Sequence, residues 1–151
     1  MGKPKRILAV CTGNSCRSVM AKGLLKKLLA GRDVQVASAG VSAIPGFRPT
    51  RETVEVMAKD GIDVSGHLTQ RLTADMVDRA DLILVMEHWH KEQILRLSSS
   101  AKPKVFLLKE FVDQTQGAEI EIPDPIAKPS EFYERCYQMI KECVEKVVAK
   151  L

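Results

Sequence analysis

The sequence predicts an α/β protein built on a doubly wound, four-stranded parallel sheet. Four apolar runs of strand length alternate with segments in which apolar residues recur at helical spacing. This alternation is typical of a parallel sheet with right-handed crossover helices. The chain has 151 residues and shows no internal repeat, low-complexity tract or linker. We therefore expect one domain over residues 1–151.

The first unit of this pattern is a strand, a turn and a helix. The strand is expected over residues 6–10, which are almost entirely apolar, as in a central strand covered on both faces. After the turn, a helix is expected over residues 18–30, and Gly31 suits its C-terminal end. The next strand is expected over residues 34–37. The buried face of the helix should carry Met20, Leu24 and Leu28.

The middle of the chain begins with a long loop over residues 38–49, punctuated by Gly and Pro. Loops of this length in a compact domain are often functional. A helix should follow over residues 50–61 and a shorter one over residues 73–79. Residues 82–86 are apolar throughout and predict the third strand, followed by a helix over residues 88–97.

The last part of the chain supplies the fourth strand and the final helix. The strand is expected over residues 105–108, and residues 111–128 look irregular. A helix should begin near Ser130, just after Pro129. Its apolar residues have helical spacing and are Phe132, Cys136, Met139, Ile140, Cys143, Val147 and Leu151.

The turn between the first strand and the first helix is the strongest candidate for a functional site. Cys11 and Arg17 lie in it, separated by five residues. The backbone N–H groups of such a turn and the positive end of the helix dipole bind anions and stabilise a thiolate. Because ligands bind beyond the carboxyl ends of parallel strands, Asp124, which follows the fourth strand, can reach the same edge.

These residues match the needs of phosphate ester hydrolysis. Cys11 can attack phosphorus, and Arg17 can hold two phosphoryl oxygens with its planar guanidinium. Asp124 can protonate the leaving group and then activate water, with its backbone restrained by Pro125. The remaining residues of the turn supply backbone donors for a phosphate-binding loop, namely Thr12, Gly13, Asn14, Ser15, Cys16 and Ser18.

Three of these loop residues have more specific expected roles. Gly13 and Asn14 are residue types that tolerate the positive φ that such a loop requires. Ser18 is expected to hydrogen-bond the thiolate and to cap the first helix. Taken alone, Cys11 would more often be a packed core residue and Asp124 a simple turn. Their combination with the loop favours catalysis.

Composition and charge exclude several other classes of protein. The net charge is +4 with 5% aromatic residues, which suits an anionic substrate better than nucleic acid. No apolar run approaches the roughly 20 residues of a membrane span, and residues 1–6 lack the apolar segment of a signal peptide. We expect a cytoplasmic, monomeric protein that binds neither nucleic acid nor membrane.

The cysteine and histidine residues predict neither disulfides nor a metal site. Without a secretory signal, the four cysteines do not indicate a disulfide framework. No pair of cysteines has the CxxC spacing of zinc ligands, and the spacing of His67, His88 and His90 is not that of a zinc site either.

The motifs together resemble the low-molecular-weight protein tyrosine phosphatase family. The likeness covers nearly the whole chain. It implies a flavodoxin-like fold, a cysteinyl-phosphate intermediate, phosphorylated protein substrates and no cofactor. The residues that carry it are Val10-Cys11-Thr12-Gly13-Asn14-Ser15-Cys16-Arg17-Ser18, Asp124-Pro125, Ser38-Ala39-Gly40, Gly61-Ile62-Asp63, Ala80-Asp81-Leu82-Ile83-Leu84 and the C-terminal helix.

The resemblance also assigns roles to individual residues. It implies that Cys11 is the nucleophile, Arg17 the phosphate binder and Asp124 the general acid. The side chains expected to support the loop are Asn14, Ser18, Ser38 and His67. Cys16 matches a family cysteine that pairs reversibly with the nucleophile under oxidation; inert packing is the equal alternative for it.

Departures from the family pattern bear on the substrate. Val19 replaces a proline that is usual there, and Ile126-Ala127 replace the aromatic residues that stack on phosphotyrosine. Ser15 is small and polar where tyrosine-directed members carry a bulky aliphatic residue. A bacterial branch, the protein arginine phosphatases, has a small polar residue there, and residues 86–91 and 104–111 also look like that branch. Phosphoarginine is therefore an alternative to phosphotyrosine.

Two further functions remain as alternatives. Arsenate reductases share the fold and often the loop sequence, but they need a cysteine pair just after the third strand, where this chain has none. Cys136 and Cys143 have a similar separation yet lie on the apolar stripe of the last helix. A non-catalytic phosphate-binding module could dispense with Cys11 and Asp124, both of which are present.

Overall fold

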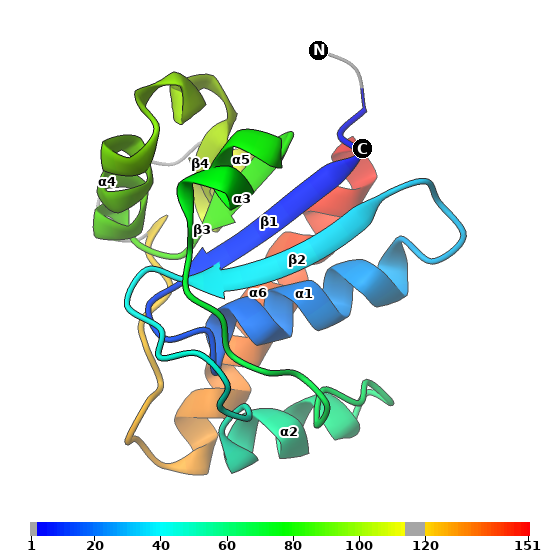
Figure 1. Cartoon of the computed structure of the whole chain (residues 1–151). Helices are drawn as coiled ribbons and strands as arrows, with labels where there is room; N and C mark the ends of the chain where they lie inside the picture. The colour runs from blue at the N-terminus through cyan, green and yellow to red at the C-terminus, as the bar shows by residue number, and fades with distance from the viewer. Residues whose placement is uncertain (1–2, 114–119) are drawn as a thin grey trace.

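The computed structural model describes residues 3–113 and 120–151 and contains the expected four-stranded parallel sheet. Its strand order is β2-β1-β3-β4 and every neighbouring pair is parallel (Figure 1). The fold prediction is thus confirmed. The strands are β1 Arg6–Cys11, β2 Gln35–Gly40, β3 Leu82–Val85 and β4 Val105–Leu107.

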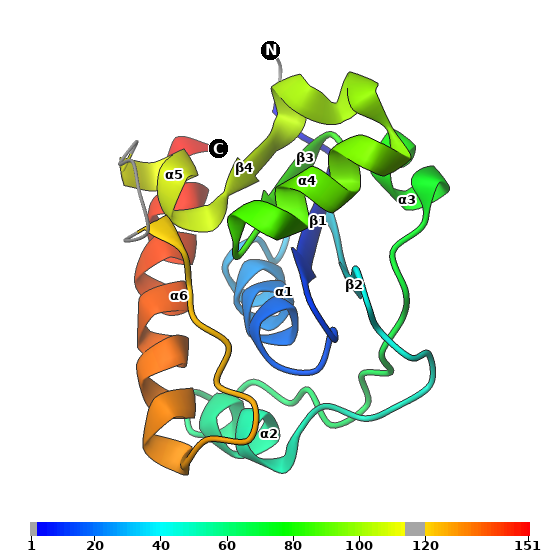
Figure 2. The ribbon, with the colours of Figure 1, turned by 90° about the vertical axis from the view of Figure 1, so that its left-hand side faces the viewer.

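Helices cover both faces of this sheet. One face packs against α1 and α6, and the other against α3 and α4, as the two views of the ribbon show (Figures 1 and 2). The helices are α1 Arg17–Leu28, α2 Arg51–Ala58, α3 Ala74–Arg79, α4 His88–Leu97, α5 Leu108–Asp113 and α6 Ser130–Lys150, with a 3₁₀ segment at Ser99–Lys104.

Side chains of strand β1 point alternately into two hydrophobic cores, one on each face of the sheet. Ile7, Ala9 and Cys11 face the core beneath α1 and α6, whereas Leu8 and Val10 face the core beneath α3 and α4. Successive side chains of a strand point to opposite faces, so a continuous apolar run serves two cores at once. This arrangement leaves the carboxyl end of β1, with Cys11, at the edge of the sheet where ligands bind.

Two segments differ from the sequence-based expectation. Residues 38–40 belong to β2 and not to the following loop, because pairing with β1 continues to Cys11 opposite Gly40. A Cβ atom on Gly40 would lie 2.5 Å from the carbonyl oxygen of Thr12, so glycine permits the close approach of the two chains. Strand β4 ends at Leu107, one residue before the expected end, and α5 over Leu108–Asp113 extends into the stretch from residue 111 that was expected to be irregular; the Phe111 ring packs on the Phe106 ring at 5.2 Å.

The buried face of α1 is also displaced from the expected one. Met20 and Leu24 are buried, but Leu28 is 38% exposed, and Leu25 and Leu29 are buried in its place. The cause is that α1 packs against both the sheet and α6, so its apolar surface covers more than one stripe. In α6, Cys136 and Cys143 are buried in the core, as their spacing predicts.

Candidate active site

The loop between β1 and α1 has one residue in the left-handed region. Asn14 has φ of 57°, whereas Gly13, also expected to allow positive φ, does not adopt it. Asparagine tolerates this conformation better than most residues because its short amide can hydrogen-bond locally. The loop therefore gets its turn from Asn14, and the Asn14 side chain remains available for contacts.

Hydrogen bonds of Asn14 orient the hydroxyl beside the cysteine sulfur. Asn14 Nδ2 donates to Ser18 Oγ at 2.8 Å and to Ser38 Oγ at 2.9 Å. Ser18 Oγ lies 2.9 Å from Cys11 Sγ. Since Ser18 accepts from the amide, its own proton is free to point at the sulfur. The expected contact with Cys11 is confirmed, but helix capping by Ser18 is wrong, because α1 begins at Arg17 and its N-cap is Cys16.

The orientation of the Asn14 amide is set from the far side of the loop. Asn14 Oδ1 accepts from the backbone N–H of Gln70 at 3.0 Å and lies 3.2 Å from His67 Nε2. Lys22 Nζ lies 2.7 Å from His67 Nδ1, so Nδ1 is the acceptor and Nε2 carries the proton. Burial, followed by the charge of Lys22, lowers the pKa of His67. The structure thus places Ser38 and His67 beside Asn14, as expected.

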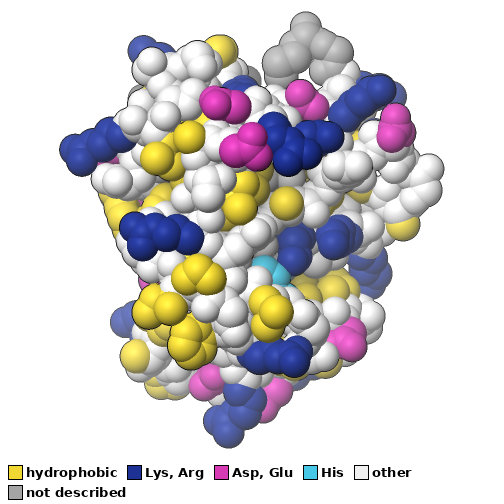
Figure 3. Space-filling model, viewed as in Figure 1, with side chains coloured by type: hydrophobic (Ala, Val, Ile, Leu, Met, Phe, Trp, Pro, Cys, Tyr) yellow, Lys and Arg dark blue, Asp and Glu magenta, His cyan; other side chains and the backbone are white. Residues whose placement is uncertain are grey.

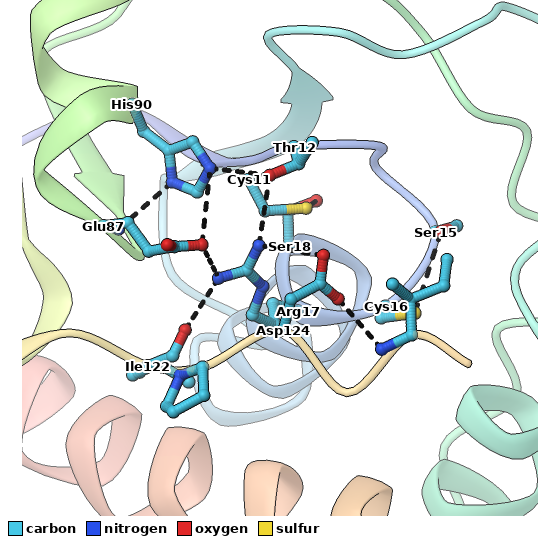
Figure 4. Close-up of polar contacts among 12 residues, drawn as sticks. Cys11, Thr12, Ser15, Cys16, Arg17, Ser18, Glu87, His90, Ile122 and Asp124 are labelled. Carbon is cyan, nitrogen blue, oxygen red and sulfur yellow. Dashed lines mark hydrogen bonds and ion pairs between the residues drawn. The ribbon is translucent and has the colours of Figure 1, made fainter. Parts of the chain in front are cut away.

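Arg17 is 1% exposed, and its guanidinium is held from several sides (Figure 4). Its Nη1 donates to the Glu87 carboxylate and, at 2.7 Å, to the carbonyl of Ile122. Its Nη2 donates to Thr12 Oγ1 at 3.2 Å and lies 3.5 Å from Asp124 Oδ2. Nη1 thus donates to two protein acceptors, which leaves the Nη2 side of the guanidinium as the one that can grip an oxyanion.

The charges around Arg17 keep it ionised despite its burial. Burial by itself lowers the pKa of the guanidinium, but the negative charges of Cys11, Glu87 and Asp124 outweigh this effect and raise it. A buried cation with paired carboxylates is a fixed source of positive charge. The site therefore offers a permanent positive charge beside the sulfur.

Asp124 lies at the same edge of the sheet as the phosphate-binding loop. Its side chain is 35% exposed and its Oδ1 accepts from the backbone N–H of Ile126 at 3.0 Å. The segment is anchored by the Ile122 N–H, which donates to the Met86 carbonyl at 2.9 Å. A carboxylate that is both open to solvent and adjacent to the guanidinium can exchange protons with a ligand held there.

Sequence reasoning missed Glu87 and His90, which complete the site behind Arg17. His90 is fully buried at the start of α4 and lies 2.9 Å from Thr12 Oγ1. Glu87 lies two residues after the end of β3, at the N-cap of α4, and binds the guanidinium. A usable signal was present, because polar residues just after a buried parallel strand face the same edge as the loop after β1.

The surroundings of Ser15 and Cys16 leave their predicted roles untested. Ser15 is half-buried, and its Oγ lies 3.7 Å from Cys16 Sγ. Cys16 is buried, with its Sγ 3.5 Å from Thr50 Oγ1 and 3.9 Å from the Tyr133 hydroxyl.

Cys136 bears on the alternative of arsenate reduction. Burial raises the pKa of its thiol to about 12, so this cysteine is poorly suited to a disulfide relay.

Apolar side chains are exposed near this edge of the molecule. Figure 3 shows hydrophobic side chains gathered at the lower left of the face seen in Figure 1, over the loops beyond β2. The loops carrying Phe47 and Thr69 are joined by paired hydrogen bonds. The most exposed apolar side chains of these loops and of the Asp124 segment are Ile44, Phe47, Leu68 and Ile126.

Comparison with known proteins defines the family. Residues 6–151 match the family model described as low molecular weight phosphotyrosine protein phosphatase. The chain belongs to this family. It is 41% identical over 147 residues to a probable low molecular weight protein-tyrosine-phosphatase, EpsP, from Ralstonia nicotianae, covering 97% of this chain and 96% of the relative.

Arginine phosphatases are also among the similar proteins. The chain is 38% identical over 149 residues to the protein-arginine-phosphatase of Geobacillus stearothermophilus, covering 98% of this chain and 97% of the relative. It superimposes on a YwlE arginine phosphatase variant with a phosphorylated active-site serine, with a TM-score of 0.90 and 34% identity over 97% of this chain and 95% of the other. Proteins named as tyrosine phosphatases and proteins named as arginine phosphatases are thus both among the relatives of this chain.

Two further findings concern membrane-spanning helices and metal-binding clusters. Within residues 3–113 and 120–151, no helix has the length and apolar character needed to cross a membrane. In the same part of the chain, no three histidine, cysteine or acidic side chains come together as a metal ion would require.

Proposed function

We propose that this member of the family hydrolyses phosphorylated protein side chains, with Cys11, Arg17 and Asp124 as its catalytic residues. The observation that carries this proposal is the convergence of the three side chains. The Arg17 guanidinium contacts both the Asp124 carboxylate and Thr12 of the phosphate-binding loop that starts at Cys11 (Figure 4). The exposed apolar side chains around this edge suit contact with a protein substrate.

The reaction proceeds in two steps. In the first, Cys11 Sγ attacks phosphorus, the bond to the leaving atom breaks, and Asp124 gives that atom its proton. In the second, Asp124 takes a proton from water, and the resulting hydroxide attacks phosphorus and releases the thiolate. Arg17 and the loop N–H groups neutralise the charge on the phosphoryl oxygens in both steps.

Substitution of the nucleophile tests the proposal. Cys11→Ser should abolish phosphate release from p-nitrophenyl phosphate, whereas Cys143→Ser, in α6, should retain it. Turnover by Cys11→Ser at the wild-type rate would overturn the assignment. A phosphate-binding module without catalysis would show binding of inorganic phosphate but no turnover even in the wild type.

Phosphoarginine is the second candidate substrate, and Ser15 is the observation that favours it. Its hydroxyl lies in the loop, half-buried and without a bulky aliphatic group that would pack on a phenyl ring. Ile126 beside the acid is not aromatic either. The similarity to protein-arginine-phosphatases supports the same alternative. Phosphotyrosine is supported by the family match and by EpsP.

A further inference from the structure

His90 is a fully buried histidine that takes no part in the two steps above. The backbone N–H of Glu87 donates to His90 Nδ1 at 3.1 Å. A backbone amide can act only as a donor, so Nδ1 carries no proton and Nε2–H is the donor. The tautomer of this ring is therefore determined by the main chain at the start of α4.

The Nε2–H group is directed at the hydroxyl of Thr12. His90 Nε2 lies 2.9 Å from Thr12 Oγ1, and Arg17 Nη2 donates to the same oxygen at 3.2 Å (Figure 4). A hydroxyl oxygen has two lone pairs and one proton. Both lone pairs accept hydrogen bonds from these donors. In any further hydrogen bond, the Thr12 hydroxyl can therefore act only as the donor.

That proton has no acceptor among the described residues, although Thr12 is half-buried. Thr12 Oγ1 lies beside Arg17 Nη2, which is also the nitrogen nearest the Asp124 carboxylate. An oxygen bound on this edge of the guanidinium lies next to the Thr12 hydroxyl. The geometry thus leaves the Thr12 hydroxyl proton free to be donated to an oxyanion bound there.

We propose that the Thr12 hydroxyl donates a hydrogen bond to a phosphoryl oxygen of the substrate, and that His90 is the positioning residue that turns it into a donor. This inference rests on the proposed phosphatase function. It assigns Thr12 a side-chain contact with the substrate in addition to the backbone contact expected of every residue in the loop.

A different role for His90 would be to transfer a proton during the reaction, but the surroundings of the ring argue against this role. Burial, followed by the charge of Arg17, lowers the pKa of His90 to about 3. Glu87 Oε2 is the nearest carboxylate oxygen, 3.9 Å from Nε2. The ring is therefore neutral at the pH of an ordinary assay and acts as a constant donor. A role confined to capping α4 through Glu87 would affect stability but not phosphate affinity.

Thr12→Val and Thr12→Ser form the deciding pair of variants. Valine keeps the shape and removes the hydroxyl, whereas serine keeps the hydroxyl. We expect Thr12→Val to raise the inhibition constant of inorganic phosphate and to lower kcat/KM for p-nitrophenyl phosphate, each by about 10-fold, the scale of one hydrogen bond to a charged group. Thr12→Ser should stay within about 3-fold of the wild type. Wild-type phosphate inhibition in Thr12→Val would overturn the proposal.

The part played by His90 is tested in the same assay. His90→Phe removes the donor and should reproduce the effect of Thr12→Val, while His90→Gln can supply an amide N–H and should recover part of the affinity. In the double variant, adding His90→Phe to Thr12→Val should reduce phosphate affinity and kcat/KM little further, because the two side chains act through one contact. If the losses of the two single variants add fully in the double variant, His90 does not act through Thr12. His88→Gln, at an exposed histidine of the same helix, is the matched control.

The wild type separates this inference from the proposed function. If it does not hydrolyse aryl phosphates, the proposed function fails, and the phosphate affinities of wild type and Thr12→Val, measured by calorimetry, still decide the Thr12 contact. If it hydrolyses them and Thr12→Val behaves like the wild type, the inference alone fails. Should His90→Phe not fold, the two Thr12 variants and His90→Gln retain the test.

Discussion

Ser18 Oγ lies 2.9 Å from Cys11 Sγ while it accepts a hydrogen bond from Asn14. The accepted bond leaves the Ser18 proton directed at the sulfur, so the contact stabilises a thiolate. The buried position of all three side chains keeps water from competing for the same bonds.

Removal of the Ser18 hydroxyl should slow catalysis. In Ser18→Ala the sulfur loses its nearest hydroxyl donor and Asn14 loses an acceptor, so we expect kcat for p-nitrophenyl phosphate to fall by about 10-fold or more. Steady-state kinetics measure this, with Ser42→Ala, at an exposed serine, as the control. A Ser18→Ala enzyme with the wild-type kcat would show that the contact has no catalytic role.

Replacement of the proposed acid should depend on the leaving group. Asp124→Asn cannot donate a proton, and we expect hydrolysis of phenyl phosphate to slow by about 100-fold or more. The loss should be smaller for p-nitrophenyl phosphate, because p-nitrophenolate departs without protonation. Asp33→Asn, at an exposed site, is the control. Equal losses on the two substrates would point to another acid.

The identity of residue 15 should influence specificity. Ser15→Ile removes a hydroxyl and adds aliphatic bulk, so we expect the ratio of kcat/KM for phosphotyrosine over phosphoarginine peptides to rise by about 10-fold. Ser15→Thr keeps the hydroxyl and should change the ratio little. If Ser15→Ile leaves the ratio unaltered, residue 15 does not select the substrate.

The neutral state of His90 predicts a loss of stability in acid. Its pKa is lowered from 6.5 to about 3 in the folded protein, so the unfolded chain binds more protons between these values. The stability contributed by neutral His90 is complete above pH 6.5 and is lost as the pH falls toward 3. The slope is at most about 1.4 kcal/mol per pH unit.

Urea denaturation at pH 7, 6, 5 and 4.5 measures this contribution. The free energy of unfolding should fall more steeply in the wild type than in His90→Gln, which lacks the titrating ring. His88→Gln should follow the wild type. Parallel curves for wild type and His90→Gln would mean that His90 is protonated as easily in the folded chain as in the unfolded one.

Cys16 should protect the nucleophile from irreversible oxidation. Peroxide converts the Cys11 thiolate to a sulfenic acid, and attack by the Cys16 thiol forms a disulfide and releases water. We expect dithiothreitol to restore wild-type activity after peroxide treatment and to restore much less in Cys16→Ser. Cys143→Ser is the control. Equal recovery in wild type and Cys16→Ser would favour inert packing of Cys16.

Much of the fold could be predicted because its signals are local. The bounds of α4 and the start of α6 were expected correctly, and the four strands lie where the apolar runs predicted them. The errors occur where partners decide the conformation. Pairing with β1 extends β2 to Gly40, and packing of Phe111 on Phe106 accompanies a helical turn in a stretch without helical periodicity.

The sequence by itself determined the strand–loop–helix unit with Cys11 and Arg17 and the placement of Asp124 in a late loop, because short-range chemistry and parallel-sheet topology predict these features. The tertiary structure alone decided what holds them. Glu87 and His90 are 70 and 78 residues from the partners that they contact in the loop. No periodicity encodes such a distance, and only folding brings buried donors and acceptors together until each is satisfied.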